Sequence, residues 1–312
     1  MAKVFIDGAA GTTGLAIRER LAGRRDLDLI TLPEEVRKDP AARAEALNRA
    51  DAAILCLPDA AAVEAVGLID PANTHTAVID TSTAHRTAEG WTYGFPELAG
   101  QREKIRASKR IANPGCHASG FIALAAPLRD AGVLPADARL TVTSLTGYSG
   151  GGKKMIAEYE AAGRDPLLDA PRMYGLSQTH KHLPEMKAVC RLDREPIFCP
   201  IVAPFYAGME VILPLFAEEI GTDAEGIAGI YRSYYGEGGA VRFAGSAGEK
   251  EGGFLSAGAF AGRDSMEITV EGNGERILLT ARFDNLGKGA SGAAVQNMNL
   301  LLGFEEYAGL NL

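Results

Sequence analysis

Several features that mark other classes of protein are missing from this sequence of 312 residues. The net charge is -8 and no basic cluster is present, which argues against a nucleic-acid partner because phosphate binding needs concentrated positive charge. No apolar run approaches the roughly 18 residues that a membrane-spanning helix requires. The first seven residues already have the pattern of a strand and leave no room for a signal peptide. We therefore expect a cytoplasmic protein with no membrane or nucleic-acid partner.

The sequence also lacks paired cysteines, internal repeats and low-complexity tracts. Its four cysteines show none of the short spacings of a zinc site or a disulfide framework, so we expect no bound metal. A hydrophobic fraction of 46% and a charged fraction of 23% are typical of a globular protein, and the length predicts two domains. We expect one domain over residues 1–115, completed by the C-terminal segment 288–312, and a second over residues 116–287.

The chain begins with an apolar strand over Lys3–Ile6, a glycine loop and a helical pattern over Leu15–Ala22. A glycine loop between a strand and a helix lets the backbone approach a pyrophosphate group at the helix N-terminus. A plain tight turn is the alternative, but the flanking strand and helix favour a dinucleotide site. The candidate cofactor-binding residues are Gly8, Gly11, Thr12, Thr13 and Gly14.

Strand and helix patterns then alternate, with strands expected at Leu27–Leu32, Ala52–Leu57 and Ala77–Asp80. This alternation predicts an α/β fold with a Rossmann-type, doubly wound parallel sheet. Such sheets bind ligands beyond the C-terminal ends of their strands, where Pro58 and Ser82 are further candidates for cofactor contact.

The segment after the second strand bears on the choice of cofactor. Thr31-Leu32-Pro33 stands where an acidic residue usually binds the ribose of NAD, and Arg37 and Lys38 follow closely. The missing acid and the nearby positive charge favour NADP, although the two cations have the alternative of being ordinary solvated loop residues.

The later segments have the pattern of antiparallel strands. Met266–Glu271 and Glu275–Asp284 flank a hairpin turn, and Val211–Ala217 alternates in the same way. We expect a second α+β domain for substrate binding and dimerisation, with a mostly antiparallel sheet. One face of that sheet would pack on a core and the other would be free for helices or a subunit partner. A last helix over Ala293–Leu302 is expected to pack on the first domain.

One cysteine lies where a loop of turn residues meets a helix. Asn113-Pro114-Gly115 strongly favours a turn, and Gly120–Ala131 has an apolar helical pattern. Cys116 is therefore expected near a helix N-terminus, where the helix dipole lowers the pKa of a thiol and raises its reactivity. The alternative is that Cys116 simply packs in the core.

A second cluster of chemically active side chains is His180-Lys181-His182-Leu183-Pro184-Glu185. Leu183 precedes a proline, which predicts an extended segment with His180 and His182 on one face. The pair has three interpretations, namely metal ligands, hydrogen-bonded structural histidines, or a base for Cys116. Glu185 either orients an imidazole or complements the dipole of a following helix.

Two further groups are candidates for binding an anionic substrate. The glycine loop that contains Ser149 ends in Lys153 but lacks the Gly-Lys-Ser/Thr ending of a P-loop, which argues against nucleoside triphosphate binding. Its backbone donors and Lys153 suit a substrate phosphate or carboxylate. Arg86 is able to hold an anion bidentately, or alternatively to form a surface ion pair.

A thiol, a histidine base and a nicotinamide site together predict reduction of an activated carboxyl group. The thiolate would displace phosphate from an acyl phosphate, and hydride transfer to the thioester would then give an aldehyde.

The sequence resembles the N-acetyl-gamma-glutamyl-phosphate reductase family of arginine biosynthesis, particularly its shorter type. The resemblance covers nearly the whole chain and rests on the glycine loop and on these motifs: Tyr93-Gly94-Phe95-Pro96-Glu97-Leu98, Asn113-Pro114-Gly115-Cys116, Ser149-Gly150, His180 to Glu185, Gly208-Met209 and Asn285 to Asn297. The cysteine and histidine motifs are specific when they occur together.

That resemblance implies NADPH-dependent reduction of N-acetyl-L-glutamyl 5-phosphate to the 5-semialdehyde, in a homo-oligomer, either dimer or tetramer. It implies that Cys116 is the nucleophile, that His182 is the acid/base with His180 nearer the substrate, and that Asn285 and Gly289 contact the cofactor. His117 departs from the longer relatives, in which an aromatic residue is common, and is a rival base.

Three alternatives remain at this point. The chain could be an aspartate-semialdehyde dehydrogenase, a lysine-pathway acyl-phosphate reductase, or an inactive NADP-binding sensor that keeps the fold. The joint presence of Cys116 and His182 argues against the sensor.

Overall fold

The computed structural model describes residues 1–246 and 252–312, which divide into two compact units. Unit 1 consists of Met1–Pro96, Gly100–Pro114 and Ala290–Leu310. Unit 2 consists of Glu97–Ala99, Gly115–Gly289 and Asn311–Leu312. The chain therefore passes from unit 1 to unit 2 immediately before Cys116.

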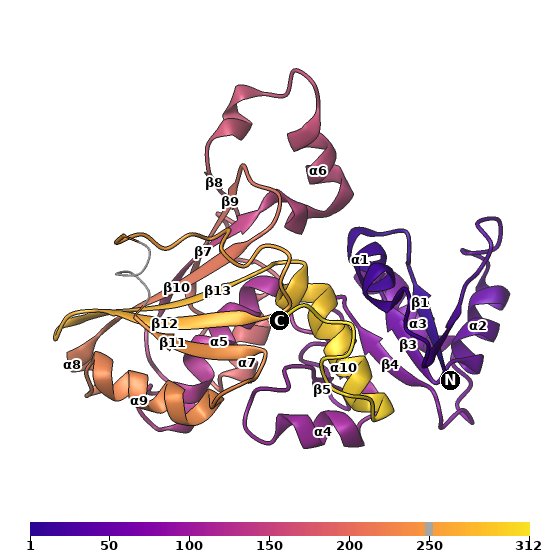
Figure 1. Ribbon diagram of the computed structural model, residues 1–312, viewed down its shortest axis with the longest axis horizontal. Coiled ribbons are helices and arrows are strands. Elements are labelled where there is room, and N and C mark those ends of the chain that lie inside the picture. The colour runs from indigo at the N-terminus through magenta and orange to yellow at the C-terminus, as the bar shows by residue number, and fades with distance from the viewer. Residues whose placement is uncertain (247–251) are drawn as a thin grey trace. The chain divides into compact units, whose positions relative to one another are not determined.

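Unit 1 is built on a six-stranded sheet in the order β2-β1-β3-β4-β6-β5, in which every pairing is parallel (Figure 1). This confirms the predicted parallel sheet. From β1 the chain continues to β2 on one side of the sheet and then to β3 and β4 on the other side. The loops that follow β1 and β3 therefore leave the sheet towards opposite faces. The strands are β1 (Ala2–Asp7), β2 (Leu27–Ile30), β3 (Ala52–Leu55), β4 (Ala77–Asp80), β5 (Thr92–Tyr93) and β6 (Arg110–Ala112).

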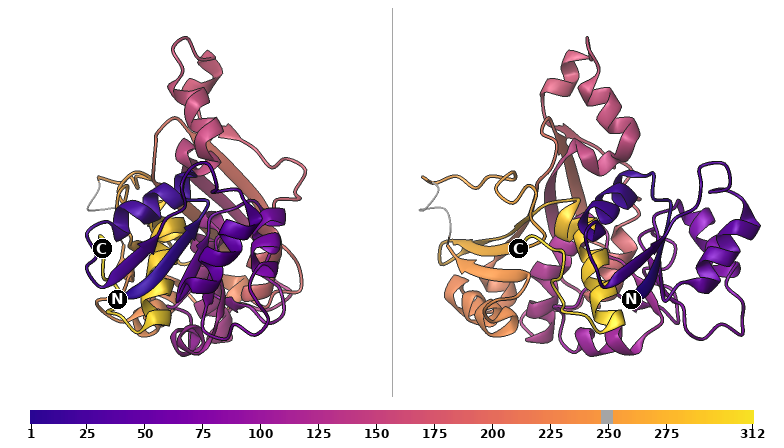
Figure 2. Two further views of the ribbon diagram at one scale, coloured as in Figure 1. Left: turned by 90° about the vertical axis from the view of Figure 1, so that its right-hand side faces the viewer. Right: turned by 45° about the vertical axis from the view of Figure 1, so that its right-hand side comes forward.

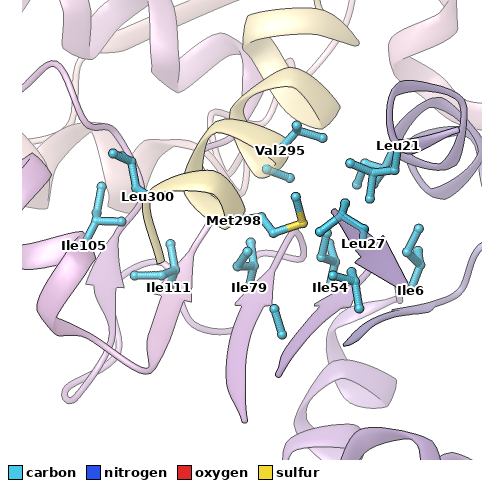
Figure 3. Close-up of a cluster of buried hydrophobic side chains, with 14 residues drawn as sticks. Ile6, Leu21, Leu27, Ile54, Ile79, Ile105, Ile111, Val295, Met298 and Leu300 are labelled. Carbon is cyan, nitrogen blue, oxygen red and sulfur yellow. The ribbon is translucent and has the colours of Figure 1, made fainter. Parts of the chain in front are cut away.

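Two apolar layers cover the two faces of this sheet. Val4 and Ile6 point to one face and pack with α1 and the C-terminal helix α10, from which Val295 and Met298 reach the strands (Figure 3). Phe5 points to the other face and packs with α2 and α3. This alternation along one strand is what places helices on both faces. The helices are α1 (Thr12–Leu21), α2 (Pro40–Arg49), α3 (Asp59–Gly67), α4 (Gln101–Ala107) and α10 (Gly292–Leu302).

Unit 2 is built on a seven-stranded mixed sheet in the order β11-β12-β13-β10-β7-β9-β8. Four of the six described pairings are antiparallel and two are parallel, which confirms the predicted mostly antiparallel sheet. The strands are β7 (Thr141–Gly147), β8 (Arg172–Met173), β9 (Ile197–Ala203), β10 (Met209–Phe216), β11 (Val241–Gly245), β12 (Met266–Gly272) and β13 (Arg276–Phe283).

The two faces of this second sheet differ. One face packs on α5 (Cys116–Asp130) and α9 (Ala224–Tyr235). The fit to α5 is close because a Cβ added to Gly120 would lie 2.4 Å from Cγ2 of Val211. The opposite face exposes apolar side chains, with Phe216 52% and Leu278 44% exposed.

The remaining helices of unit 2 are short: α6 (Gly152–Glu160), α7 (Leu183–Val189), α8 (Ala217–Ile220) and the turns η1 (Tyr148–Gly151), η2 (Pro166–Asp169) and η3 (Gly287–Ser291). The segment that carries α6 projects beyond the end of β7, β8 and β9 (Figures 1 and 2). Within the described part of the chain, no helix has the length and apolar character needed to span a membrane.

Candidate active site

Cys116 is the first residue of α5, and Gly115 in an extended conformation caps the helix. The helix is 15 residues long, so its first turn presents backbone N–H groups and the positive end of a full dipole to the sulfur. The Cys116 side chain is partly exposed, whereas Cys190 is buried. This position combines access with stabilisation of a thiolate.

The segment after β13 packs directly against Cys116. A Cβ added to Gly289 would lie 3.0 Å from Cβ of Cys116, so a side chain at this position would crowd the cysteine. The neighbouring Lys288 is buried and donates to both carboxylate oxygens of Glu97, each at 2.8 Å. A paired, buried lysine fixes the η3 turn beside the thiol.

The expected extended segment around the two histidines is wrong. His180 leads into a turn at Lys181 and His182, and α7 begins at Leu183. Pro184 lies in the first turn of α7, where a helix has no need of the missing N–H. The two rings nevertheless lie together, with centroids 4.7 Å apart, because the turn allows the His182 backbone N–H to donate to Nδ1 of His180 at 3.2 Å.

Glu185 links His182 to the loop that carries the thiol. Its Oε2 accepts a hydrogen bond from the backbone N–H of Gly115 at 3.2 Å, and its Oε1 lies 3.9 Å from Nε2 of His182. Glu185 is 1% exposed and His182 is 5% exposed. The Glu185 carboxylate therefore lies within ion-pair distance of the His182 imidazole. Glu185 is also the acidic residue in the first turn of α7, so both expected roles are compatible with its position.

His117 differs from the other two histidines because both of its ring nitrogens are hydrogen-bonded within the protein. Nδ1 lies 2.7 Å from Oγ of Ser144, and Nε2 lies 2.6 Å from the hydroxyl of Tyr174. Burial, with a smaller contribution from the charge of His180, lowers the pKa of His117 to about 3. His117 is therefore neutral near pH 7, and both nitrogens already have partners.

The candidate substrate-binding residues are distributed over both units. Ser149 is buried, and its hydroxyl accepts from the side-chain amide of Asn285 at 2.9 Å. Asn285 also accepts from the backbone N–H of Gly208, which ties three loops of unit 2 together. Lys153 is exposed in the first turn of α6, whose preceding glycine loop is a 3-10 turn. Arg86 lies in unit 1 and donates to the carbonyls of Asn113 and Thr81 at 3.0 and 3.2 Å.

The glycine loop of unit 1 is tightly constrained. Gly8 has a φ of +85°, and a Cβ there would lie 2.3 Å from the carbonyl oxygen of Cys56. A Cβ on Gly14 would lie 2.5 Å from the carbonyl oxygen of Gly8. Gly11 caps α1, so Thr12 and Thr13 are the first residues of that helix. The backbone is thus open to a phosphate group at a helix N-terminus, as the fingerprint requires.

The other two candidates in unit 1 lie at the same edge of the sheet. Pro58 caps α3, and Ser82 is buried with its hydroxyl bonded to Asp80 at 2.7 Å. Asp80 also lies 2.6 Å from Nδ1 of His85, so the Ser82 side chain belongs to a local network.

A cavity of about 470 Å³ adjoins the glycine loop. The segment after β2 supplies part of its wall, because β2 ends at Ile30 and not at the predicted Leu32. Four cations and two acids line it: Arg18, Arg37, Lys38, Arg43, Asp7 and Glu34. Both acids are ion-paired, Asp7 with Arg43 at 2.9 Å and Glu34 with Arg37 at 2.6 Å. The glycine loop and the basic lining of the cavity fit a dinucleotide phosphate.

Comparison with known proteins places the chain in a family. Residues 116–285 match the family model described as semialdehyde dehydrogenase, dimerisation domain. An N-acetyl-gamma-glutamyl-phosphate reductase from Rhizobium etli is 48% identical over 306 residues, covering 96% of this chain and 98% of the relative. One from Chelativorans is 50% identical over 308 residues, with the same coverage. The chain belongs to the N-acetyl-gamma-glutamyl-phosphate reductase family.

Solved structures share the fold of this chain at low sequence identity. Aspartate semialdehyde dehydrogenase II from Vibrio cholerae aligns with a TM-score of 0.71 at 19% identity, covering 97% of this chain and 99% of that one. Aspartate semialdehyde dehydrogenase from Candida albicans, solved with NADP, has a TM-score of 0.67 at 15% identity, with 97% and 99% coverage. These matches support the two-sheet architecture of the reductase.

Sequence reasoning missed the two hydrogen-bond partners of His117, Tyr174 and Ser144. Ser144 is an inward-facing position of β7 and was hidden in the alternating strand pattern. Tyr174 follows the two-residue strand β8, and no local motif marks it. No group of three or more His, Cys, Asp and Glu side chains that is suited to a metal ion occurs among residues 1–246 and 252–312.

Proposed function

We propose that the protein reduces N-acetyl-L-glutamyl 5-phosphate to N-acetyl-L-glutamate 5-semialdehyde with release of phosphate, in arginine biosynthesis. The observation that carries the proposal is that Glu185 links His182 to Gly115, the residue directly before Cys116 at the start of α5. The two relatives described above are named for this activity.

The thiolate of Cys116 attacks the acyl carbon of the substrate. A C–S bond forms, the bond from carbon to the phosphate oxygen breaks, and inorganic phosphate leaves. The resulting thioester holds the acyl carbon at the N-terminus of α5, whose N–H groups favour negative charge as it develops on the acyl oxygen.

A nicotinamide cofactor held by the glycine loop would supply the hydride for reduction of the thioester carbon. His182 donates a proton to the oxygen of the thiohemiacetal, and His180 contacts the substrate. His182 then takes this proton back as the C–S bond breaks, which releases the aldehyde and restores the Cys116 thiolate.

Lys153 is the proposed contact for the substrate phosphate or carboxylate, with Ser149 shaping the loop before it. Its position in the first turn of α6 adds the helix N–H groups to its own charge. Arg86 is a weaker candidate, because at least two of its N–H groups already donate to backbone carbonyls. A phosphate KM that is unchanged in Lys153→Ala and raised in Arg86→Ala would reverse this assignment.

The reverse reaction tests the proposed substrate. The purified protein is given NADP, phosphate and either N-acetylglutamate semialdehyde or aspartate semialdehyde, and NADPH absorbance is followed. We expect turnover to depend on phosphate and to be faster with the acetylated semialdehyde. Faster turnover of aspartate semialdehyde would assign the chain to that activity, and turnover of neither would favour the sensor.

The cavity beside the glycine loop favours NADP over NAD. Two of its four cations, Arg37 and Lys38, lie in the segment that follows β2, where the 2′-phosphate of NADP is bound in this type of fold. The Glu34 carboxylate in the same wall is held by Arg37, so it is not placed to select a ribose hydroxyl.

Replacing Arg37 and Lys38 together by alanine is expected to raise the KM for NADPH by about 10- to 100-fold, the worth of one or two charge-assisted hydrogen bonds. The KM for NADH should change by less than about threefold. Arg49→Ala is the matched control, because Arg49 is exposed and pairs with Glu45 on α2. Equal changes for both cofactors would exclude a role in phosphate recognition.

We propose that a second copy of the chain covers the exposed face of the unit 2 sheet, with a dimer or tetramer as the result. Pro214 and Leu278 are register partners on this face, and Phe216 continues the apolar surface along β10. The family model that covers this sheet is described as a dimerisation domain. Light scattering should give the mass of an oligomer that falls in the double variant Phe216→Asp, Leu278→Asp, and a monomeric native chain would contradict the proposal.

A further inference from the structure

Three side chains of unit 2 form a buried hydrogen-bonded chain beside Cys116. Ser144 of β7 and Tyr174 after β8 bind opposite nitrogens of His117, at 2.7 and 2.6 Å. Ser144 is 0% exposed and His117 is 3% exposed, so solvent does not compete for these bonds. Tyr174 forms the outer end of the chain.

The neutral imidazole gives this chain two consistent arrangements. A neutral histidine donates from one nitrogen and accepts at the other, and both hydroxyl groups are free to rotate. In the first arrangement Tyr174 donates to Nε2 and the His117 Nδ1–H donates to Ser144. In the second, Ser144 donates to Nδ1 and the His117 Nε2–H donates to the Tyr174 oxygen. Only the second arrangement leaves the Tyr174 proton available for another acceptor.

The outer end of the chain lies beside His180. The Tyr174 ring packs on His180 with centroids 5.9 Å apart, and the His117 ring contacts both His180 and His182. His117 follows Cys116 directly in α5. Burial raises the pKa of Tyr174 and the nearby charge of Cys116 raises it further, so the phenol keeps its proton and lies within range of the thiolate charge.

We propose that Tyr174 is a further catalytic residue, whose hydroxyl donates a hydrogen bond to the acyl oxygen of the group bound at Cys116. His117 and Ser144 are positioning residues that maintain the second arrangement. Tyr174 transfers no proton, because its pKa is far above that of an imidazole, and proton transfer remains with His182. The inference rests on the proposed function, since it requires an acyl group on Cys116.

The hydrogen bond acts when negative charge develops on the acyl oxygen. This happens twice, once when the thiolate attacks and once when hydride reaches the thioester, and a fixed donor stabilises both transition states. A donor of this kind lowers the barrier more than it tightens substrate binding, so its loss should appear mainly in kcat.

The test compares Tyr174→Phe with Tyr231→Phe in the assay for the reverse reaction. Tyr231 is a matched control, because it is buried and its hydroxyl donates at 2.7 Å to the carbonyl of Leu124, which is eight residues along α5 from Cys116. We expect Tyr174→Phe to lower kcat by about 10²–10³-fold with KM changed less than about threefold, the usual effect of losing one such donor. Tyr231→Phe should stay within about threefold of the native kcat.

The kcat of Ser144 variants distinguishes a positioning role of this hydroxyl from a purely structural one. Ser144→Ala removes the donor that selects the second arrangement and should lower kcat about tenfold, whereas Ser144→Thr keeps a hydroxyl and should restore most of it. His117 does not titrate between pH 5 and 9. The kcat of each variant should therefore be lower at every pH in this range, and the profile of kcat against pH should keep its position on the pH axis.

A native kcat in Tyr174→Phe, or a loss confined to KM, would overturn the inference while leaving the proposed function intact. An equal loss in Tyr231→Phe would show that the effect is structural and would also overturn it. If the native chain turns over neither semialdehyde, the proposed function and this inference fail together.

Discussion

Replacing Cys116 by serine is expected to lower turnover by on the order of 10⁴–10⁶-fold, which is the scale of loss when a covalent nucleophile is removed. A serine hydroxyl has nearly the size of the thiol, so the close packing of Gly289 on this residue is preserved. Its pKa is far too high for the helix dipole to generate the alkoxide near pH 7. The thioester cannot form, and the carboxyl group is not activated for reduction.

Binding of NADPH should survive this change, because the residues that line the cavity beside the glycine loop do not include Cys116. Titration calorimetry with NADPH is the measurement, and a Kd within about threefold of the native value is expected. Cys199→Ser is the matched control, since Cys199 is also partly exposed but lies in β9 outside the proposed site. Retained turnover in Cys116→Ser would refute the covalent mechanism.

Replacing His182 by alanine is expected to lower kcat by about 10²–10⁴-fold, the usual contribution of a general acid–base group. The imidazole near Glu185 supplies the proton for the thiohemiacetal oxygen, and no other histidine of the cluster is equivalent. His117 is neutral and bonded at both nitrogens, whereas His180 accepts from the backbone of His182 through Nδ1. Steady-state kinetics of the reverse reaction measures the loss.

The pH dependence separates His182 from the residues around it. In His182→Ala the limb of the kcat profile that reports the acid/base group should disappear, while variants at His117 should lower the whole profile without moving it. His75→Ala, an exposed change in unit 1, is the control. A larger loss in His180→Ala than in His182→Ala would move the assignment to His180.

Local pattern predicted the parts of the site that depend on neighbours in sequence. The turn residues before Cys116 and the apolar run after it predicted a helix start, and α5 begins at that residue. Glycines between a strand and a helix predicted a loop with no room for side chains, and the near contacts of Gly8 and Gly14 are of this kind. Each of these inferences needs only the chemistry of the backbone over a few residues.

The same local reasoning failed where a turn replaced a strand. A residue before proline favours extended backbone, which predicted a strand through His180 and His182. Pro184 instead occupies the first turn of α7, where the same ring is tolerated. Both conformations suit proline, and the choice between them was made by the packing of α7 on α5 rather than by the sequence around the histidines.

The sequence by itself determined the fold class, the thiol at a helix start and the glycine loop, because these follow from periodicity, turn chemistry and residue type. Only the tertiary structure decided what each group touches. Tyr174 meets His117 across 57 residues and Ser144 meets it across 27, and Glu185 reaches Gly115 across 70. Contacts over such separations are set by how strands and helices pack, so the neutral state of His117 and the position of Tyr174 emerged only when the chain was folded.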